Sequence, residues 1–342
     1  MPWPRWSSSR FVRIAAIGAA LLLVALGLTY RQYVSDEFFA NVYVRLPDGD
    51  VKRISPDAPG KYYEAHVHPS GELAVFFGNA TGPPQIWLTR FDDFKPVALT
   101  ASEHASRHPA FAPVGDEIVF VSDMNSGSPP DIVENMGIDG APSQGVNTHI
   151  YVMKRDGSGV RQLTFGAHQD QRPTFSPDAK SIAFVSNRGG DYGVWTISMT
   201  AGAGADPVPL VVDEFAYRPS YSPDGEWLYF FTAKGAGRHQ ICRLRLTSKQ
   251  RECLQNDDRG YSHGPFPSPA GNYVLMHSTR GGNWALWKVP LDGSPPSSIQ
   301  PAPFRIALHP TEARNGTLTF DVLSRPEPVE TLLAWKHAWF GD

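Results

Sequence analysis

Three side chains with metal-binding chemistry stand close together early in the chain: Glu64, His66 and His68. Alternate residues of a strand point to the same face, so these three would lie side by side, a spacing that could suit a metal ion. An innermost strand of stacked sheets is packed on both sides, however, and the sequence places no third histidine nearby. We therefore expect ordinary polar contacts here, with neither a metal nor a cofactor.

A second group of polar side chains recurs five residues before a repeated proline. Four of its members are basic or can become so, and they could attract a carboxylate, a phosphate or an acidic loop of a partner. An alternative is that an arginine before proline caps backbone carbonyls and holds neighbouring sheets together. The group consists of Glu64, His108, Arg172, Arg218, Gly264 with the adjacent His263, and Arg305.

The repeated proline marks an internal repeat of about 45 residues. Its copies are Pro69, Pro113, Pro177, Pro223, Pro269 and a weaker one at Pro310, spaced by 44, 64, 46, 46 and 41 residues. Short alternating apolar strands follow each copy, ending seven residues later at a large apolar residue in the first five. The 31 glycines and 31 prolines of the 342 residues supply the turns between strands. A unit of this length with four short strands is typical of a propeller blade.

Six copies predict an all-β, six-bladed β-propeller of four-stranded blades over residues 41–340. Residues 41–55 form a hairpin that supplies only the two outer strands of a blade, and 305–336 supplies its complement. Joining both ends in one blade closes the ring and hides its edges. Loops that lead into the inner strands then lie on one face, so the polar group above should ring one mouth of the central channel.

The second repeat is about twenty residues longer than the others. Its extra residues, about 124–147, fall in a connection between two strands on the same face as the polar group. Long loops on a regular scaffold often bind partners, although a flexible decoration is the alternative. The expected contact residues of this loop are Asp131, Ile132, Val133, Glu134, Met136 and Asp139.

The two cysteines flank a turn near residues 247–249. Cys242 and Cys253 face each other, and could form a disulfide, only in the strand register in which their numbers sum to 495. Two unpaired buried thiols are the alternative.

The first thirty residues read as an export signal. Arg5, Arg10 and Arg13 precede an uncharged apolar run from 14 to 28, which predicts a single transmembrane anchor with its N-terminus inside. A cleaved signal peptide is the alternative. Residues 31–40 would be a linker, and both interpretations place the rest of the chain on the periplasmic side of the inner membrane. A net charge of −3 gives no reason to expect nucleic acid.

The best-preserved repeats resemble those of TolB-type six-bladed propellers. The residues that carry this resemblance are Arg172-Pro173-Thr174-Phe175-Ser176-Pro177-Asp178, the strand 182–187 and the stretch 151–164, which ends in Arg161-Gln162-Leu163-Thr164. The resemblance covers about residues 40–336, with an expected membrane anchor where TolB has an α/β domain. It implies periplasmic location and binding of other proteins.

Related repeats form the gating domain of prolyl-oligopeptidase-like enzymes, but no Gly-x-Ser-x-Gly elbow follows the last repeat. We therefore expect no enzyme activity, and a scaffold or extrinsic subunit that binds protein partners in a membrane complex. The alternative is a propeller enzyme or small-anion sensor that uses the basic channel mouth.

Overall fold

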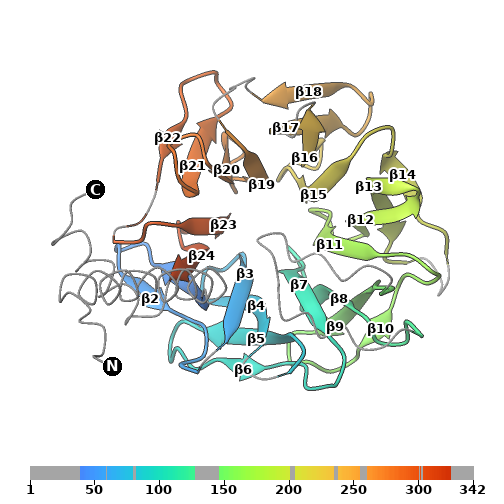
Figure 1. The fold of residues 1–342 in the computed structure, drawn as a ribbon, viewed down its shortest axis with the longest axis horizontal. Helices are drawn as coiled ribbons and strands as arrows, with labels where there is room; N and C mark the ends of the chain where they lie inside the picture. The colour runs from blue at the N-terminus through green and yellow to red at the C-terminus, as the bar shows by residue number, and fades with distance from the viewer. Residues whose placement is uncertain are drawn as a thin grey trace, which may run out of the picture. The chain divides into compact units, whose positions relative to one another are not determined.

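A computed structural model describes residues 39–324, except for 59, 80–81, 128–145, 201–204, 235–237, 255–259, 300 and 302. Every helix or strand assigned in these ranges is a β-strand, in agreement with the predicted all-β class (Figure 1). Across this part of the chain no helix has the length and apolar character needed to cross a membrane. The expected anchor at 1–30, residues 31–38 of the expected linker, the contact residues of the long loop and the segment 325–336 all lie outside the described residues, and the last two linker residues begin a strand at 39.

Four of the sheets each contain four antiparallel strands in chain order, which is the pattern of a propeller blade. The first comprises β7 (Ser106–Phe111), β8 (Glu117–Ser122), β9 (His149–Lys154) and β10 (Arg161–Gln162), and the second β11 (Asp170–Phe175), β12 (Ser181–Gly189), β13 (Asp191–Ser198) and β14 (Val208–Val211). The third comprises β15 (Ala216–Tyr221), β16 (Trp227–Lys234), β17 (Arg238–Arg245) and β18 (Arg251–Leu254), and the fourth β19 (Ser262–Pro267), β20 (Tyr273–Ser278), β21 (Ala285–Pro290) and β22 (Ser297–Ser298).

The remaining strands form one eight-stranded sheet that joins the two ends of the described chain. Its first group is β3 (Lys61–Val67), β4 (Leu73–Asn79), β5 (Gln85–Arg90) and β6 (Val97–Ala98). Its second group is β23 (Ala307–Glu312), β24 (Leu318–Ser324), β1 (Phe39–Arg45) and β2 (Val51–Arg53), where β24 and β1 are neighbours. A single parallel pair, Ala40 with Lys61, links the two groups. Strands distant in sequence therefore share one sheet.

Large apolar residues on the second strand of each group fill the space between neighbouring sheets. Phe76, Phe120, Phe184 and Phe230, which recur seven residues after the repeated proline, are completely buried. Each buried phenylalanine contributes about 1.5–3 kcal/mol of hydrophobic stabilisation. The sequence repeat is thus a repeat of core positions.

The first strand of each group lies closest to a common centre (Figure 1). These strands are β3, β7, β11, β15, β19 and β23, and each loses its regular register with the following strand at one point, a β-bulge. In five of these six strands the residue after the centre of the bulge is a proline, at 109, 173, 219, 265 and 310. Proline is tolerated at a bulge because the ladder needs no N–H there. The bulges position the residues of the candidate site.

A candidate site in the central channel

Each bulge holds its central residue in the left-handed backbone region. Glu64, His108, Arg172, Arg218 and His309 have φ between 50° and 55°, and Gly264 has φ of 61°. This region is unfavourable for residues other than glycine, so five such positions in one ring represent stored backbone strain. All six residues line one cavity in the channel. We call them the channel ring.

Glu64 is the centre of the polar contacts within the ring. Its Oε1 accepts a hydrogen bond from Nη2 of Arg218 at 2.7 Å, and its Oε2 accepts one from Nη1 of Arg172. Nε2 of His108 lies 4.0 Å from Oε2. The Glu64 side chain is only 11% exposed, so these ion pairs are shielded from solvent. One carboxylate therefore joins β3 to β11 and β15 across the channel.

His309 and Asp321 extend this network to the last two strands. The backbone N–H of Glu64 donates to both carboxylate oxygens of Asp321, at 2.9 and 2.8 Å. Nδ1 of His309 lies 2.5 Å from Oδ2 of Asp321, and its Nε2 lies 2.7 Å from Nη2 of Arg218. Arginine can only donate, so Nε2 accepts and the ring proton sits on Nδ1, which donates to Asp321. The network thereby links β3 and β15 to β23 and β24.

Burial and charge together shift the pKa values of these groups. Burial opposes ionisation of Glu64, but Arg172 and Arg218 outweigh it and lower the pKa of Glu64 to about 2. Burial, followed by nearby arginines, lowers the pKa of His108 and His309 well below the usual range, so both are neutral. Burial raises the pKa of Asp321 well above its usual value, and the hydrogen bond from Glu64 N opposes that rise.

The structure corrects three details of the sequence interpretation. The ring residues are the third or fourth residues of their strands, so they lie within the strands and not in the loops that lead into them; His108 and Arg172 are only 5% exposed. Arg305 is exposed, before β23 begins, and does not line the cavity. His263 is buried beside the ring, against Phe231 and His277.

The ring member that sequence reasoning missed is His309, and the reason is a misaligned repeat. In the preceding four repeats the ring residue is followed by one proline and, four residues later, by the repeated proline. Pro310 is the first of these two, and Arg314 stands where the second would be. Aligning the last repeat on its first proline identifies His309 directly.

Asp321 was also missed. It pairs with Leu308, and the corresponding partners in the other blades are Phe77, Val121, Val185, Phe231 and His277. Four of these five partners are apolar, so a carboxylate at this strand position is a signal that the sequence contains. The structure shows its use, which is to bind the backbone of Glu64 and the ring of His309.

The channel cavity has a volume of about 120 Å³. Besides the ring, its wall includes His66, Thr174, Ser220 and Phe266. His66 accepts a hydrogen bond from the Phe111 N–H at 3.3 Å, and burial lowers its pKa to about 4. His68 contacts Ser70 and Phe111 instead. Within residues 39–324, outside the gaps, no group of three metal-binding side chains comes together.

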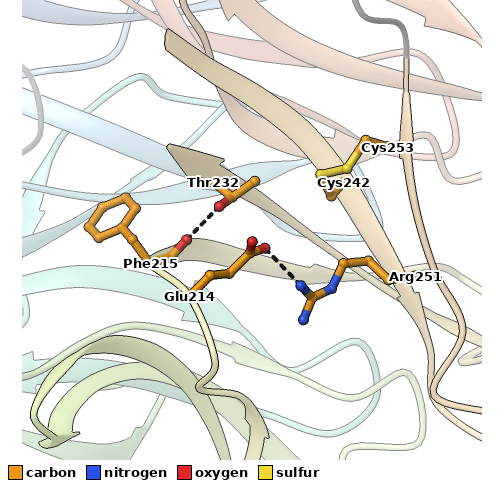
Figure 2. The surroundings of a disulfide bond; sticks show 6 residues. All are labelled: Glu214, Phe215, Thr232, Cys242, Arg251 and Cys253. Carbon is orange, nitrogen blue, oxygen red and sulfur yellow. Dashed lines mark hydrogen bonds and ion pairs between the residues drawn. A yellow bond between two sulfur atoms is a disulfide. The ribbon is translucent and has the colours of Figure 1, made fainter. Parts of the chain in front are cut away.

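The two cysteines lie on adjacent strands and are joined. Cys242 of β17 and Cys253 of β18 are direct cross-strand partners, the register in which their numbers sum to 495, and they form a disulfide bond (Figure 2). Arg251 on the same strand contacts Glu214 at 3.0 Å. The disulfide and this ion pair hold the outer strand β18 in place.

The fold and its channel define the class of this protein as a β-propeller with an ion-paired central channel. The family model described as "TolB beta propeller domain" matches residues 138–307. The resemblance inferred from the repeats is thereby confirmed.

Individual proteins give the same picture. A protein of Chlorobium luteolum named as a TolB homolog is 30% identical over 155 residues, covering 39% of this chain and 35% of its own. The Tol-Pal system protein TolB of Francisella tularensis is 25% identical over 298 residues, covering 85% of this chain and 60% of its own. This chain therefore spans about a third to three fifths of the length of these relatives. A TolB structure from Agrobacterium tumefaciens shares the fold with a TM-score of 0.64 and 16% identity, covering 85% of this chain and all of its own.

Proposed function

We propose that this protein is a non-enzymatic scaffold on the periplasmic side of the inner membrane, anchored by its N-terminal apolar segment, which binds protein partners of a membrane complex. In this proposal the propeller has six blades, the last made of β23, β24, β1 and β2. No nucleic acid or cofactor takes part.

The observation that carries the proposal is the similarity to TolB-type propellers. One of these relatives is named as a Tol-Pal system protein, and its alignment covers 85% of this chain. A scaffold also needs a rigid body, and the channel network supplies one. Through Glu64, His309 and Asp321 it ties together strands from opposite ends of the chain. Loops carried by such a body keep fixed relative positions, which favours binding of a folded partner.

The non-enzymatic part of the proposal rests on how the channel groups use one another. Glu64 is held ionised by two arginines, and both of its oxygens are engaged. A general acid or base needs a pKa near the working pH, whereas that of Glu64 is about 2. The ion pairs therefore suit a structural role better than proton transfer.

We place the partner contact at the connection between β8 and β9. Asn125 and Asn147, which lie near the two described ends of this connection, line a hollow together with Phe165. Phe165 is 44% exposed, and aromatic side chains are enriched in protein interfaces. The acidic and apolar residues predicted for contact lie within the same connection.

The test is purification of the full chain from native membranes in mild detergent, followed by sizing and identification of bound proteins. A complex larger than the lone chain, containing membrane proteins in fixed ratio, supports the proposal. Elution as a lone monomer, or release of the chain without detergent, contradicts it.

Two matched variants locate the contact. Phe165→Ser should weaken the complex, whereas Val208→Ser, at another exposed apolar residue, on β14, should leave it intact. Equal recovery of the partner with both variants would place the contact elsewhere.

A further inference from the structure

The channel cavity has features of a ligand site that scaffolding leaves unused. It is lined by residues of all six inner strands, and its volume of about 120 Å³ is enough for about four water molecules. A ligand of about four to six non-hydrogen atoms would therefore fit. The five strained non-glycine positions of the channel ring all border this cavity, and strain of this kind clusters at ligand sites.

The charges around the cavity favour an anion. Its charged lining groups are Glu64, Arg172 and Arg218, and its titratable neutral groups are His66, His108 and His309. Two guanidinium groups and one carboxylate therefore border the cavity itself, and the Asp321 carboxylate, which contacts His309, is not part of its wall. The contacts of Glu64 also show that these guanidinium groups can bind a carboxylate, because Arg172 and Arg218 both donate hydrogen bonds to it. Arginine matches the planar geometry of carboxylates especially well.

His108 is the independent sign of a ligand. Its side chain is only 3% exposed, and it lines the cavity with its ring against Phe77. Among the described residues neither of its ring nitrogens has a hydrogen-bond partner. A buried imidazole normally satisfies at least one nitrogen, because leaving it unpaired is costly. A bound molecule in the cavity would supply the missing partner.

We propose that the channel cavity binds a small free monocarboxylate, with its negative charge toward Arg172 and Arg218 and a hydrogen bond to His108. The hydroxyl groups of Thr174 and Ser220 complete the polar wall, and Phe266 faces the apolar part of the ligand. This site is separate from the partner contact proposed at Phe165.

The test is isothermal titration of the full chain in detergent at pH 7 and constant ionic strength, with acetate, propionate and lactate. Acetamide serves as the uncharged control of nearly the same shape. We expect saturable 1:1 binding of at least one carboxylate, at least tenfold tighter than that of acetamide. No saturation by any of the three up to about 10 mM, or equal affinity for acetamide, overturns the proposal.

Variants then assign the binding to the cavity. His108→Phe keeps the ring contact with Phe77 but removes the hydrogen bond, and should weaken binding about tenfold or more. Ala110→Leu adds bulk at an apolar residue of the cavity wall, and should abolish binding even if the first variant folds poorly. His68→Phe, outside the cavity, is the matched control. Wild-type affinity in Ala110→Leu, in protein with a normal melting curve, would refute the location.

Discussion

Replacing Glu64 by glutamine keeps the shape of the side chain and removes the negative charge that binds both Arg172 and Arg218. Both arginines are at least 91% buried, so neither can turn fully into solvent. Removing one partner of a buried ion pair leaves an uncompensated charge, which is strongly destabilising. We expect Glu64→Gln to lower the free energy of unfolding substantially.

The magnitude follows from the pKa of Glu64, which falls from 4.5 to about 2 on folding. That difference corresponds to about 3 kcal/mol in favour of the ionised folded form. Because the pKa is lowered in the folded state, this stabilisation is complete above about pH 4.5 and disappears as the pH falls through 2. The cost of Glu64→Gln should therefore be about 3 kcal/mol at pH 7 and about half of that at pH 3.

Urea unfolding of wild type and variant, followed by tryptophan fluorescence at pH 7, 5, 4 and 3, measures both effects. Glu72→Gln is the control, since Glu72 is exposed and its replacement should change stability by less than about 0.5 kcal/mol. The explanation is refuted if Glu64→Gln unfolds like wild type at pH 7. A loss that stays constant down to pH 3 would equally exclude the proposed charge effect.

Three further predictions concern stability and are checked by the same unfolding measurement. Arg218→Met should cost about 3–5 kcal/mol because it leaves Glu64 and His309 short of a partner, whereas Arg305→Met, at an exposed residue, should cost less than about 0.5 kcal/mol; equal costs would contradict the assigned positions. Cys242→Ser combined with Cys253→Ser should lower the free energy of unfolding by about 2–3 kcal/mol, the value for closing a loop of eleven residues. A reductant should lower the free energy of unfolding of the wild type but not that of this double variant. Gly78→Ala should cost about 1–3 kcal/mol, because a methyl group there would lie 2.6 Å from the Lys61 carbonyl oxygen; wild-type stability would show that the strand can move.

The repeat made most of the fold predictable from the sequence. Core phenylalanines recur at a fixed distance from a proline, and that distance survives because each blade must fill the same space. The hairpin at 41–55 and the strand pair after 305 were likewise readable, since both have alternating apolar residues. They correspond to β1 and β2, and to β23 and β24.

The site was only partly predictable. Spacing identified Glu64, His108, Arg172 and Arg218 as one ring, because equivalent positions of repeats converge at the centre. Spacing could not show that Glu64 binds both arginines, since that depends on side-chain reach across the channel. The one-proline shift in the last repeat also hid His309. The contact of Asp321 with the Glu64 backbone depends on how the chain ends meet, which no local pattern encodes.

The shared sheet of β1 and β24 has a consequence for how the protein is made. Synthesis delivers the chain from its N-terminus, so β1 and β3 emerge long before β24 exists to pair with β1. Until then β1 presents an open strand edge, and such edges are prone to pairing with other chains. The Glu64 backbone likewise waits for Asp321, 257 residues later. The pairing of β24 with β1 is therefore a late step that closes the shared sheet, and the interval before it is when a chaperone would be of most use.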